Sequence, residues 1–403
     1  MVGGPRSLRP VFLVSLVLAA LVLPYALLAP VVNAEAVVAT VTKVPGPVAA
    51  VYDSTKGEVF VAEYQDNAIS VISDATNSVI ATVAVGIDPF AVAFDSSKGE
   101  VFVANNGNST VSVISDTTNS VVATVKVGSG PIAVAYDSTK GEVFVADHND
   151  NTISVISDAT NAIVATVTIG VTNIRSTYTP RAVAYDPLKG EVFVVNFGNS
   201  SVSVVSDSNN SVVAKVAVGS SPIAAAYDPS RGEVVVANEG GNTVSVISDS
   251  NNTVVATVAV GVGAVAVAYD PSKGEVFVAN SQDDTVSVIA DSNDSVVATV
   301  PVGTGPFAAA YDSAKDEVFV TNVGDGTVSV IGASARPATS TTSSSASSSA
   351  TSTVPAGSYV LVLSPNTILF GLIDGAILVG LVTARQWEVR NHRRRSSQPT
   401  AAD

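Results

Sequence analysis

One phrase, Tyr-Asp-x-x-Lys-Gly-Glu-Val-Phe-Val-Ala-Asn, recurs with small changes along most of this chain. Its aspartate stands at positions 53, 95, 137, 186, 228, 270 and 312, so the spacing is 42 residues in every interval except one of 49. A fixed period of this length is typical of repeat proteins, in which each unit buries its apolar side chains against its neighbours. The seven units span residues 36–332 and form one body rather than several domains.

Each unit contains four short runs rich in Val, Ile, Thr and Phe, separated by turn-forming residues. In the third unit these runs are 132–136, 142–146, 152–157 and 163–167. Four antiparallel strands in about 42 residues are typical of a propeller blade, and seven lies within the usual number of blades. The sequence therefore predicts an all-β fold, a seven-bladed β-propeller.

The two ends of the repeat region predict how the ring closes. The last unit stops at Ile331 without a fourth strand, while residues 37–41 have a fourth-strand sequence with no unit before them. We expect this N-terminal strand to complete the last blade and to remove an edge that would otherwise aggregate. Burial of Val37, Val38 and Val41 would contribute ~1.5 to 3 kcal/mol each.

The segments outside the repeats predict a cell-surface protein. Residues 1–34 combine Arg6 and Arg9, an apolar stretch and a small-residue site ending at Ala34, which favours a signal peptide cleaved there; an uncleaved anchor is the alternative. Residues 333–358 are mostly Ser, Thr, Ala and Pro, a composition typical of a stalk.

The C-terminal part predicts a membrane anchor. Residues 359–384 are long enough to cross a bilayer as a helix, although Asp374 would be costly within it. Residues 385–403 contain five arginines, as expected of a short cytoplasmic tail. This arrangement predicts a single-pass membrane protein with the propeller outside the cell.

Composition excludes several kinds of site. The chain has no cysteine, which rules out disulfides, thiolate metal sites and a cysteine nucleophile. The net charge of -15 argues against nucleic-acid binding and comes mainly from acidic turn residues that recur in each unit. Asp147, Asn149 and Asp150 offer oxygen ligands in one loop, but their spacing matches no strong calcium motif. We predict neither a metal nor a cofactor.

The repeat resembles the YVTN family of β-propeller repeats, found in archaeal and bacterial surface proteins. The resemblance covers residues 36–332 and is carried by the Tyr-Asp, Phe-Val-Ala-Asn, Thr-Val-Ser-Val-Ile and Val-Val-Ala-Thr-Val pieces; residues 319–322, Phe-Val-Thr-Asn, come closest to the name motif. With the signal, stalk and anchor, it is similar to an archaeal surface protein. The resemblance implies the fold strongly and an activity weakly, because related propellers include lactonases, quinoprotein dehydrogenases and a copper reductase domain.

A unique site in a repeat protein must come from departures from the repeat. The seven extra residues of the long interval lie within 171–180 and contribute Arg175 and Tyr178. Arg181 follows, in a position that is apolar in the other units, and a buried arginine needs an acidic or anionic partner. Chain direction places the loops after second and fourth strands on one face. We expect a ligand-binding surface there, made of Arg175, Tyr178, Arg181, Tyr64, His148, Phe197 and Glu239.

Five Asn-x-Ser/Thr sequences are candidate N-glycosylation sites. They begin at Asn108, Asn199, Asn209, Asn251 and Asn293. The last three share one loop position in successive units, so glycans there would coat the face opposite the long connection.

Two functions fit these observations. The first is a non-catalytic, membrane-anchored propeller for adhesion, envelope structure or binding of a cell-envelope glycan or surface protein. The alternative is a secreted enzyme of lactonase or dehydrogenase type that uses Arg181 and a carboxylate such as Glu239. The repeats contain one histidine, His148, and the single tryptophan, Trp387, lies in the tail, so neither a histidine-built copper site nor a quinoprotein site is expected.

Overall fold

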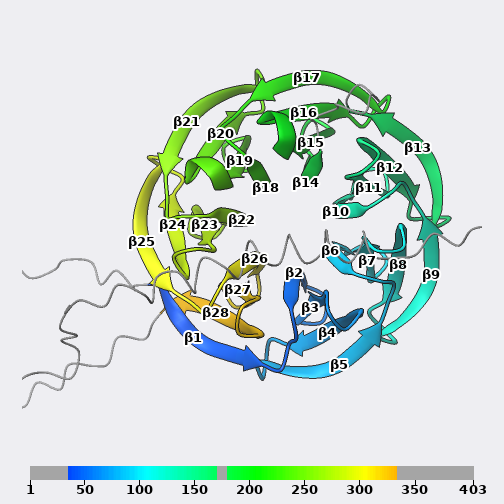
Figure 1. Ribbon diagram of the computed structural model, residues 1–403, viewed down its shortest axis with the longest axis horizontal. Coiled ribbons are helices and arrows are strands. Elements are labelled where there is room, and N and C mark those ends of the chain that lie inside the picture. The colour runs from blue at the N-terminus through cyan, green and yellow to red at the C-terminus, as the bar shows by residue number, and fades with distance from the viewer. Residues whose placement is uncertain (1–34, 170–178, 334–403) are drawn as a thin grey trace, which may run out of the picture. The chain divides into compact units, whose positions relative to one another are not determined.

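The computed structural model describes residues 35–169 and 179–333, which form a ring of seven four-stranded antiparallel sheets (Figure 1). Six sheets each consist of four consecutive strands, and the seventh has the order β1-β28-β27-β26. The predicted seven-bladed propeller is therefore confirmed. We number the blades in chain order, from blade 1 (β2 to β5) to blade 7 (β26, β27, β28 and β1).

The strands fall into four classes by their place in the blade. First strands, nearest the centre of the ring, are β2 Pro47–Asp53, β6 Pro89–Asp95, β10 Pro131–Asp137, β14 Pro180–Asp186, β18 Pro222–Asp228, β22 Ala264–Asp270 and β26 Pro306–Asp312. Second strands are β3 Glu58–Glu63, β7 Glu100–Asn105, β11 Glu142–Asp147, β15 Glu191–Asn196, β19 Glu233–Asn238, β23 Glu275–Asn280 and β27 Glu317–Asn322. Third strands are β4 Ala68–Ser73, β8 Thr110–Ser115, β12 Thr152–Ser157, β16 Ser201–Ser206, β20 Thr243–Ser248, β24 Thr285–Ala290 and β28 Thr327–Ala333. Fourth strands, on the rim, are β5 Ser78–Ala84, β9 Ser120–Lys126, β13 Ala162–Thr168, β17 Ser211–Ala217, β21 Thr253–Ala259, β25 Ser295–Pro301 and β1 Glu35–Thr42.

The N-terminal strand closes the ring as predicted. β1 pairs antiparallel with β28, from Glu35 opposite Ala333 to Thr42 opposite Thr327. Val41 is 2% exposed, and Val37 packs against the cluster between blades 6 and 7. The expected burial of Val38 is wrong: it is 45% exposed, because the pairing register skips it and a bulged residue turns outward.

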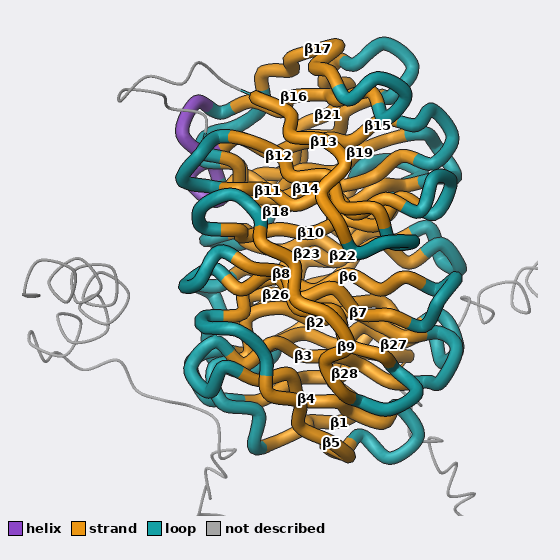
Figure 2. Tube along the Cα trace, turned by 90° about the vertical axis from the view of Figure 1, so that its right-hand side faces the viewer, coloured by secondary structure: helices purple, strands orange, loops and turns teal. Residues whose placement is uncertain are grey.

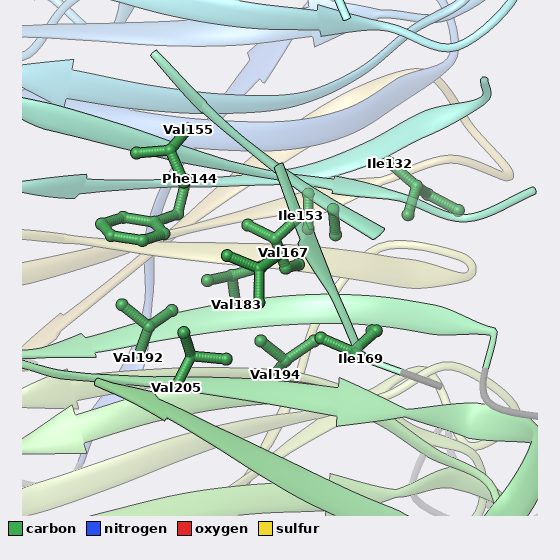
Figure 3. Packing of buried hydrophobic residues seen from close by; sticks show 12 residues of the cluster. Ile132, Phe144, Ile153, Val155, Val167, Ile169, Val183, Val192, Val194 and Val205 are labelled. Atoms are coloured by element: carbon green, nitrogen blue, oxygen red, sulfur yellow. The ribbon is translucent and has the colours of Figure 1, made fainter. Parts of the chain in front are cut away.

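The apolar core lies between neighbouring blades. Figure 3 shows one such layer, where Phe144, Ile153 and Val155 of blade 3 pack against Val192 and Val205 of blade 4. Each blade thus buries one sheet face on the preceding blade and the other on the following blade. Full burial of one such side chain contributes ~1.5 to 3 kcal/mol, so the ring is stabilised through its repeated interfaces.

The connections gather on two sides of the ring (Figure 2). The insertion face, as we name it, carries the loops after second strands and the connections after fourth strands. The turn face carries the turns after first and third strands. Two short 3-10 turns, η1 Phe197–Asn199 and η2 Glu239–Gly241, lie on the insertion face.

Charged residues of the turn face join neighbouring blades. In blades 1 to 4 the lysine of the first turn reaches the aspartate that follows the third strand of the next blade, at 3.3 to 3.8 Å. Lys315 of blade 7 reaches Asp74 of blade 1 at 3.6 Å in the same way. The recurring aspartate accepts backbone hydrogen bonds within its own turn, as Asp53 does from Thr55 and Lys56. These residues form turns as predicted, and the lysines also link the blades.

The described residues contain no helix long enough and apolar enough to cross a membrane. The predicted signal peptide, transmembrane helix and tail lie in 1–34 and 334–403, outside the described residues. So does the predicted stalk, except for its first residue, Ala333, which ends β28.

Candidate functional site

A β-bulge at the start of each first strand positions the residue that distinguishes one blade from the next. In each first strand the pairing register skips the second residue, between Pro131 and Ala133 in blade 3 for example. The skipped residues form a ring at the insertion-face end of the innermost strands. They are Val48, Phe90, Ile132, Arg181, Ile223, Val265 and Phe307. Arg181 is the one charged member of this ring.

The loops after second strands dock on the preceding connection in the same way around the ring. The backbone N–H of Tyr64 donates to Gly46 O, that of His148 to Gly130 O, and that of Phe197 to Thr179 O, at 3.0 to 3.1 Å. Glu239 N–H donates likewise to Ser221 O at 3.0 Å. The prediction that these four residues share one face is therefore correct, and backbone bonds hold their loops in place.

Three of the predicted residues come together where blades 3 and 4 meet. The Arg181 guanidinium carbon lies 5.2 Å from the centre of the Phe197 ring, within the range of a cation–π interaction. His148 Nδ1 lies 3.0 Å from the carbonyl oxygen of Pro180, the residue before Arg181. Arg181, Phe197 and His148 are each half-buried, so each keeps an exposed portion at the surface.

The histidine of this cluster has a lowered pKa. Burial lowers the pKa of His148; the bond to Pro180 opposes this, and the nearby positive charge of Arg181 lowers the pKa further. A neutral imidazole bound to a carbonyl carries its proton on Nδ1, which leaves Nε2 as an acceptor. His148 is half-buried and fixed to the next blade.

A buried carboxylate beside His148 was not predicted. Asp147 is 0% exposed and ends the second strand of blade 3, where five other blades have asparagine. Its Oδ2 accepts from Ser154 at 2.7 Å and from Thr152 at 3.1 Å. A Cβ on Gly128 would lie 2.5 Å from the Asp147 carboxyl carbon, so only glycine fits over it. Burial raises the pKa of Asp147 to about 6. The change from asparagine to aspartate was the visible signal.

Tyr64 lies in a separate aromatic cluster on the same face. Its ring meets Phe90 edge to face at 6.0 Å, and Phe90 meets Phe307 in the same manner at 5.9 Å. The chain therefore lines one part of the insertion face with aromatic rings and another with Arg181, Phe197 and His148. Glu239 begins η2, which contacts β18 and β22.

Arg175 and Tyr178, the other two candidates, lie outside the described residues. Hydrogen bonds hold the described residues on either side of the long connection. Ile169 N–H donates to the carbonyl of Asn151 at 3.2 Å, and Thr179 N–H donates to its side-chain Oδ1 at 2.9 Å.

The five candidate glycosylation sequences share one local geometry. In each, the Ser or Thr hydroxyl donates to the asparagine Oδ1 at 2.6 to 3.0 Å. Asn108, Asn209, Asn251 and Asn293 are exposed and Asn199 is half-buried. Asn108 and Asn199 lie in loops after second strands and so belong to the insertion face. Asn209, Asn251 and Asn293 lie in the turns before β17, β21 and β25, on the turn face.

A small pocket opens between blades 5 and 6 on the turn face. Its floor includes Val235, at a position where six other blades have phenylalanine, and its mouth includes Arg231, Glu233 and Asp294. Arg231 bonds Glu233 at 3.2 Å and Asp294 at 3.0 Å. Across 35–169 and 179–333, no three His, Asp or Glu side chains are grouped so that they could hold a metal ion.

No protein-family model matches this chain, and no curated protein matches it. Among solved structures, a chain of the hydrazine synthase of Kuenenia stuttgartiensis is similar, with a TM-score of 0.64 and 19% sequence identity over 72% of this chain and 96% of that chain. At this identity the likeness shows the fold alone. Because 1575 solved chains match, the fold points to no particular activity.

Proposed function

We propose that this chain is a non-catalytic binding protein of the cell surface, whose propeller recognises a component of the cell envelope through the insertion face. The resemblance to YVTN repeats of archaeal and bacterial surface proteins supports this role. The N-terminal signal, the Ser/Thr-rich stalk and the C-terminal apolar segment would place the ring outside a membrane.

One observation carries the proposal: several departures from the repeat lie in one sector of the insertion face. Arg181, His148 and the two 3-10 turns all belong to blades 3 to 5 on the insertion face, and the long connection begins and ends in the same sector, at Ile169 and Thr179. The charged side chains of the turn face bond within and between blades instead. A surface that varies on a regular scaffold is where a specific partner is recognised.

The cluster favours binding over catalysis. The guanidinium of Arg181 stacks on Phe197, and His148 uses Nδ1 to bond a backbone carbonyl. An aromatic ring beside a cation offers a flat apolar surface and a charge, which suits recognition of a polar ligand with an apolar face. A catalytic site would need unlike groups that converge on one reacting atom.

The test compares binding of the full-length protein and its Arg181→Ile variant to envelope fractions of its own cells. Isoleucine is the residue at this position in the neighbouring blades 3 and 5, so the variant keeps the local packing. We expect at least a tenfold loss of affinity, equivalent to about 1.4 kcal/mol. Leu188→Ala, on the exposed turn face of the same blade, is the matched control and should bind as the parent does.

Treating the envelope fraction with periodate or with protease separates a glycan partner from a protein partner. Equal binding by the parent and Arg181→Ile would move recognition away from this sector. A lactone-opening activity that is present in the parent and lost in Arg181→Ile would overturn the non-catalytic role and support the enzymatic alternative.

A further inference from the structure

Exposed apolar side chains gather on the rim of the ring, along the fourth strands. One residue in each fourth strand is 45 to 53% exposed, and it is the residue that the pairing register skips. These residues are Val38, Ile80, Val122, Val164, Val213, Val255 and Val297. In four blades the preceding residue is exposed as well: Val121, Ile163, Val212 and Val296. A β-branched apolar residue turned outward at the same place in every blade is a regular feature of the surface.

Within the described residues, the rim also lacks exposed carboxylates. The charged residues of the seven fourth strands are Glu35, Lys126 and Lys215. The Glu35 side chain is 7% exposed and bonds Lys273, while both lysines are exposed. Among the described residues the exposed acidic side chains are Asp66, Asp150, Asp283 and Asp325, all in loops of the insertion face, and the rim carries none.

Each fourth strand is the last strand of its sheet, so its outer edge faces away from the ring (Figure 1). A bulge interrupts the edge and disfavours continuous backbone pairing with another strand. The same bulge directs a β-branched side chain outward. Contact at this edge would therefore be made by side chains rather than by extension of the sheet.

We infer that the rim is a lateral contact surface between copies of this chain. Two copies that met through their insertion faces would bring the exposed carboxylates of those faces together, whereas the rim offers apolar side chains and no exposed carboxylate. Two identical fourth strands related by a two-fold axis present the same apolar residues to each other, as a self-complementary interface requires. The inference does not depend on the insertion face having a ligand.

The glycosylation sequences indicate which sector of the rim is free. Asn209, Asn251 and Asn293 stand just before β17, β21 and β25, and glycans there would shield the rim of blades 4 to 6. Blades 1 to 3 have no such sequence in that turn. The contact is therefore assigned to β5, β9 and β13, with Ile80, Val122 and Val164 as its outermost residues.

A contact between single strands is small. It joins a few half-exposed β-branched side chains, far less than the ~1,200 to 2,000 Å² buried in stable complexes. We expect weak association that appears as the protein concentration rises. Because the chain has no native cysteine, one introduced cysteine reports such a contact without ambiguity.

The experiment uses full-length protein in detergent with a single Val122→Cys or Val164→Cys substitution, oxidised at rising protein concentration. Leu188→Cys is the control, since Leu188 is 70% exposed on the turn face. We expect at least fivefold more disulfide-linked dimer from either rim variant than from the control. Equal yields from rim and control, or no dimer from either rim variant, would overturn the inference.

A second variant tests whether the apolar side chains drive the contact. Val122→Lys with Val164→Lys, in a protein that also carries Ile80→Cys, should reduce the dimer yield at least fivefold relative to Ile80→Cys alone. The melting temperature verifies that the ring is intact. An unchanged yield in a folded protein would show that the apolar rim does not mediate association.

Discussion

Asn151 and Thr179 join the end of the long connection to the loop after the second strand of blade 3: the Asn151 Oδ1 accepts the Thr179 N–H at 2.9 Å. The carbonyl of Asn151 also accepts the N–H of Ile169, at the start of that connection. Asn67 of blade 1 holds the short connection from Val85 to Asp88 in the same way, at 2.9 and 2.8 Å. The seven additional residues were therefore inserted between two fixed points, and the blade kept its geometry.

Replacement of Asn151 by glycine should release one end of this connection. Glycine tolerates the positive φ of 55° at this position and removes only the side-chain acceptor. We expect a loss of about 1 kcal/mol in the free energy of unfolding and faster proteolytic cleavage between residues 169 and 179. Asn67→Gly is the control: it should cost a similar free energy without creating a cleavage site. Cleavage of Asn151→Gly at the parent's rate would contradict the role of Asn151.

The buried carboxylate of Asp147 should make stability depend on pH. Its pKa is raised to about 6 in the folded protein and is about 3.9 in the unfolded chain. The folded state thus holds the proton more tightly, so this contribution is complete below about pH 4 and is lost as the pH rises through about 6. The Asp147→Asn variant should lack this pH dependence. At pH 7.5 its free energy of unfolding should exceed that of the parent by on the order of 3 kcal/mol.

Denaturant unfolding from pH 4 to pH 8 measures this difference between parent and variant. Asn238→Asp in blade 5 is the reciprocal variant, because Asn238 is also 0% exposed and bonds the equivalent Thr243 and Ser245. It should acquire the dependence that Asp147→Asn loses. Parallel stability curves for the parent and Asp147→Asn would show that Asp147 does not titrate in this range.

The regular part of this structure could be predicted from the sequence. For the irregular part, the sequence indicated which residues depart from the repeat but not which contacts they make. The 42-residue period determines the strands, the blades and the closure, because every unit repeats the same apolar pattern. The same pattern could not show that Val38 is exposed, since a bulge reverses the side to which one valine points. The sequence placed Arg181 in an apolar position and His148 on the same face. The contact of Arg181 with Phe197 depends on how strands pair within blade 4, and that of His148 with Pro180 on how blades 3 and 4 dock. Single-residue patterns encode neither.

Glu35 should complete the circle of ion pairs on the turn face. In blades 1 to 4 and in blade 7 the lysine of the first turn pairs with the aspartate after the third strand of the next blade. For Lys273 of blade 6 the equivalent position, in blade 7, is Ala333. Glu35, directly opposite Ala333 in the closing strand, bonds Lys273 at 3.0 Å instead. We expect Glu35→Gln to lower the free energy of unfolding by about 1 kcal/mol.

Adding Ala333→Asp to Glu35→Gln tests that interpretation, because it returns an aspartate to the position used in other blades. The double variant should recover most of the lost stability in denaturant unfolding. Ala333→Asp alone should change little, since Lys273 is already paired. Failure of the second substitution to restore stability would mean that Glu35 acts through the strand itself rather than through Lys273.

Val235 leaves space that six other blades fill with a phenylalanine ring. The equivalent rings, such as Phe193 and Phe277, are 0 to 1% exposed, whereas Val235 lies on the floor of the pocket between blades 5 and 6. Val235→Phe should fill this space and raise the free energy of unfolding by about 1 kcal/mol, as cavity-filling substitutions commonly do. The outcome depends on Arg231. Blade 5 has arginine where the six other blades have lysine, and its guanidinium bonds Glu233 across the pocket mouth. If Val235→Phe is destabilising, the arginine occupies the space of the ring, and Arg231→Lys combined with Val235→Phe should then be the more stable protein. A double variant no more stable than Val235→Phe alone would show that the two departures in blade 5 are independent.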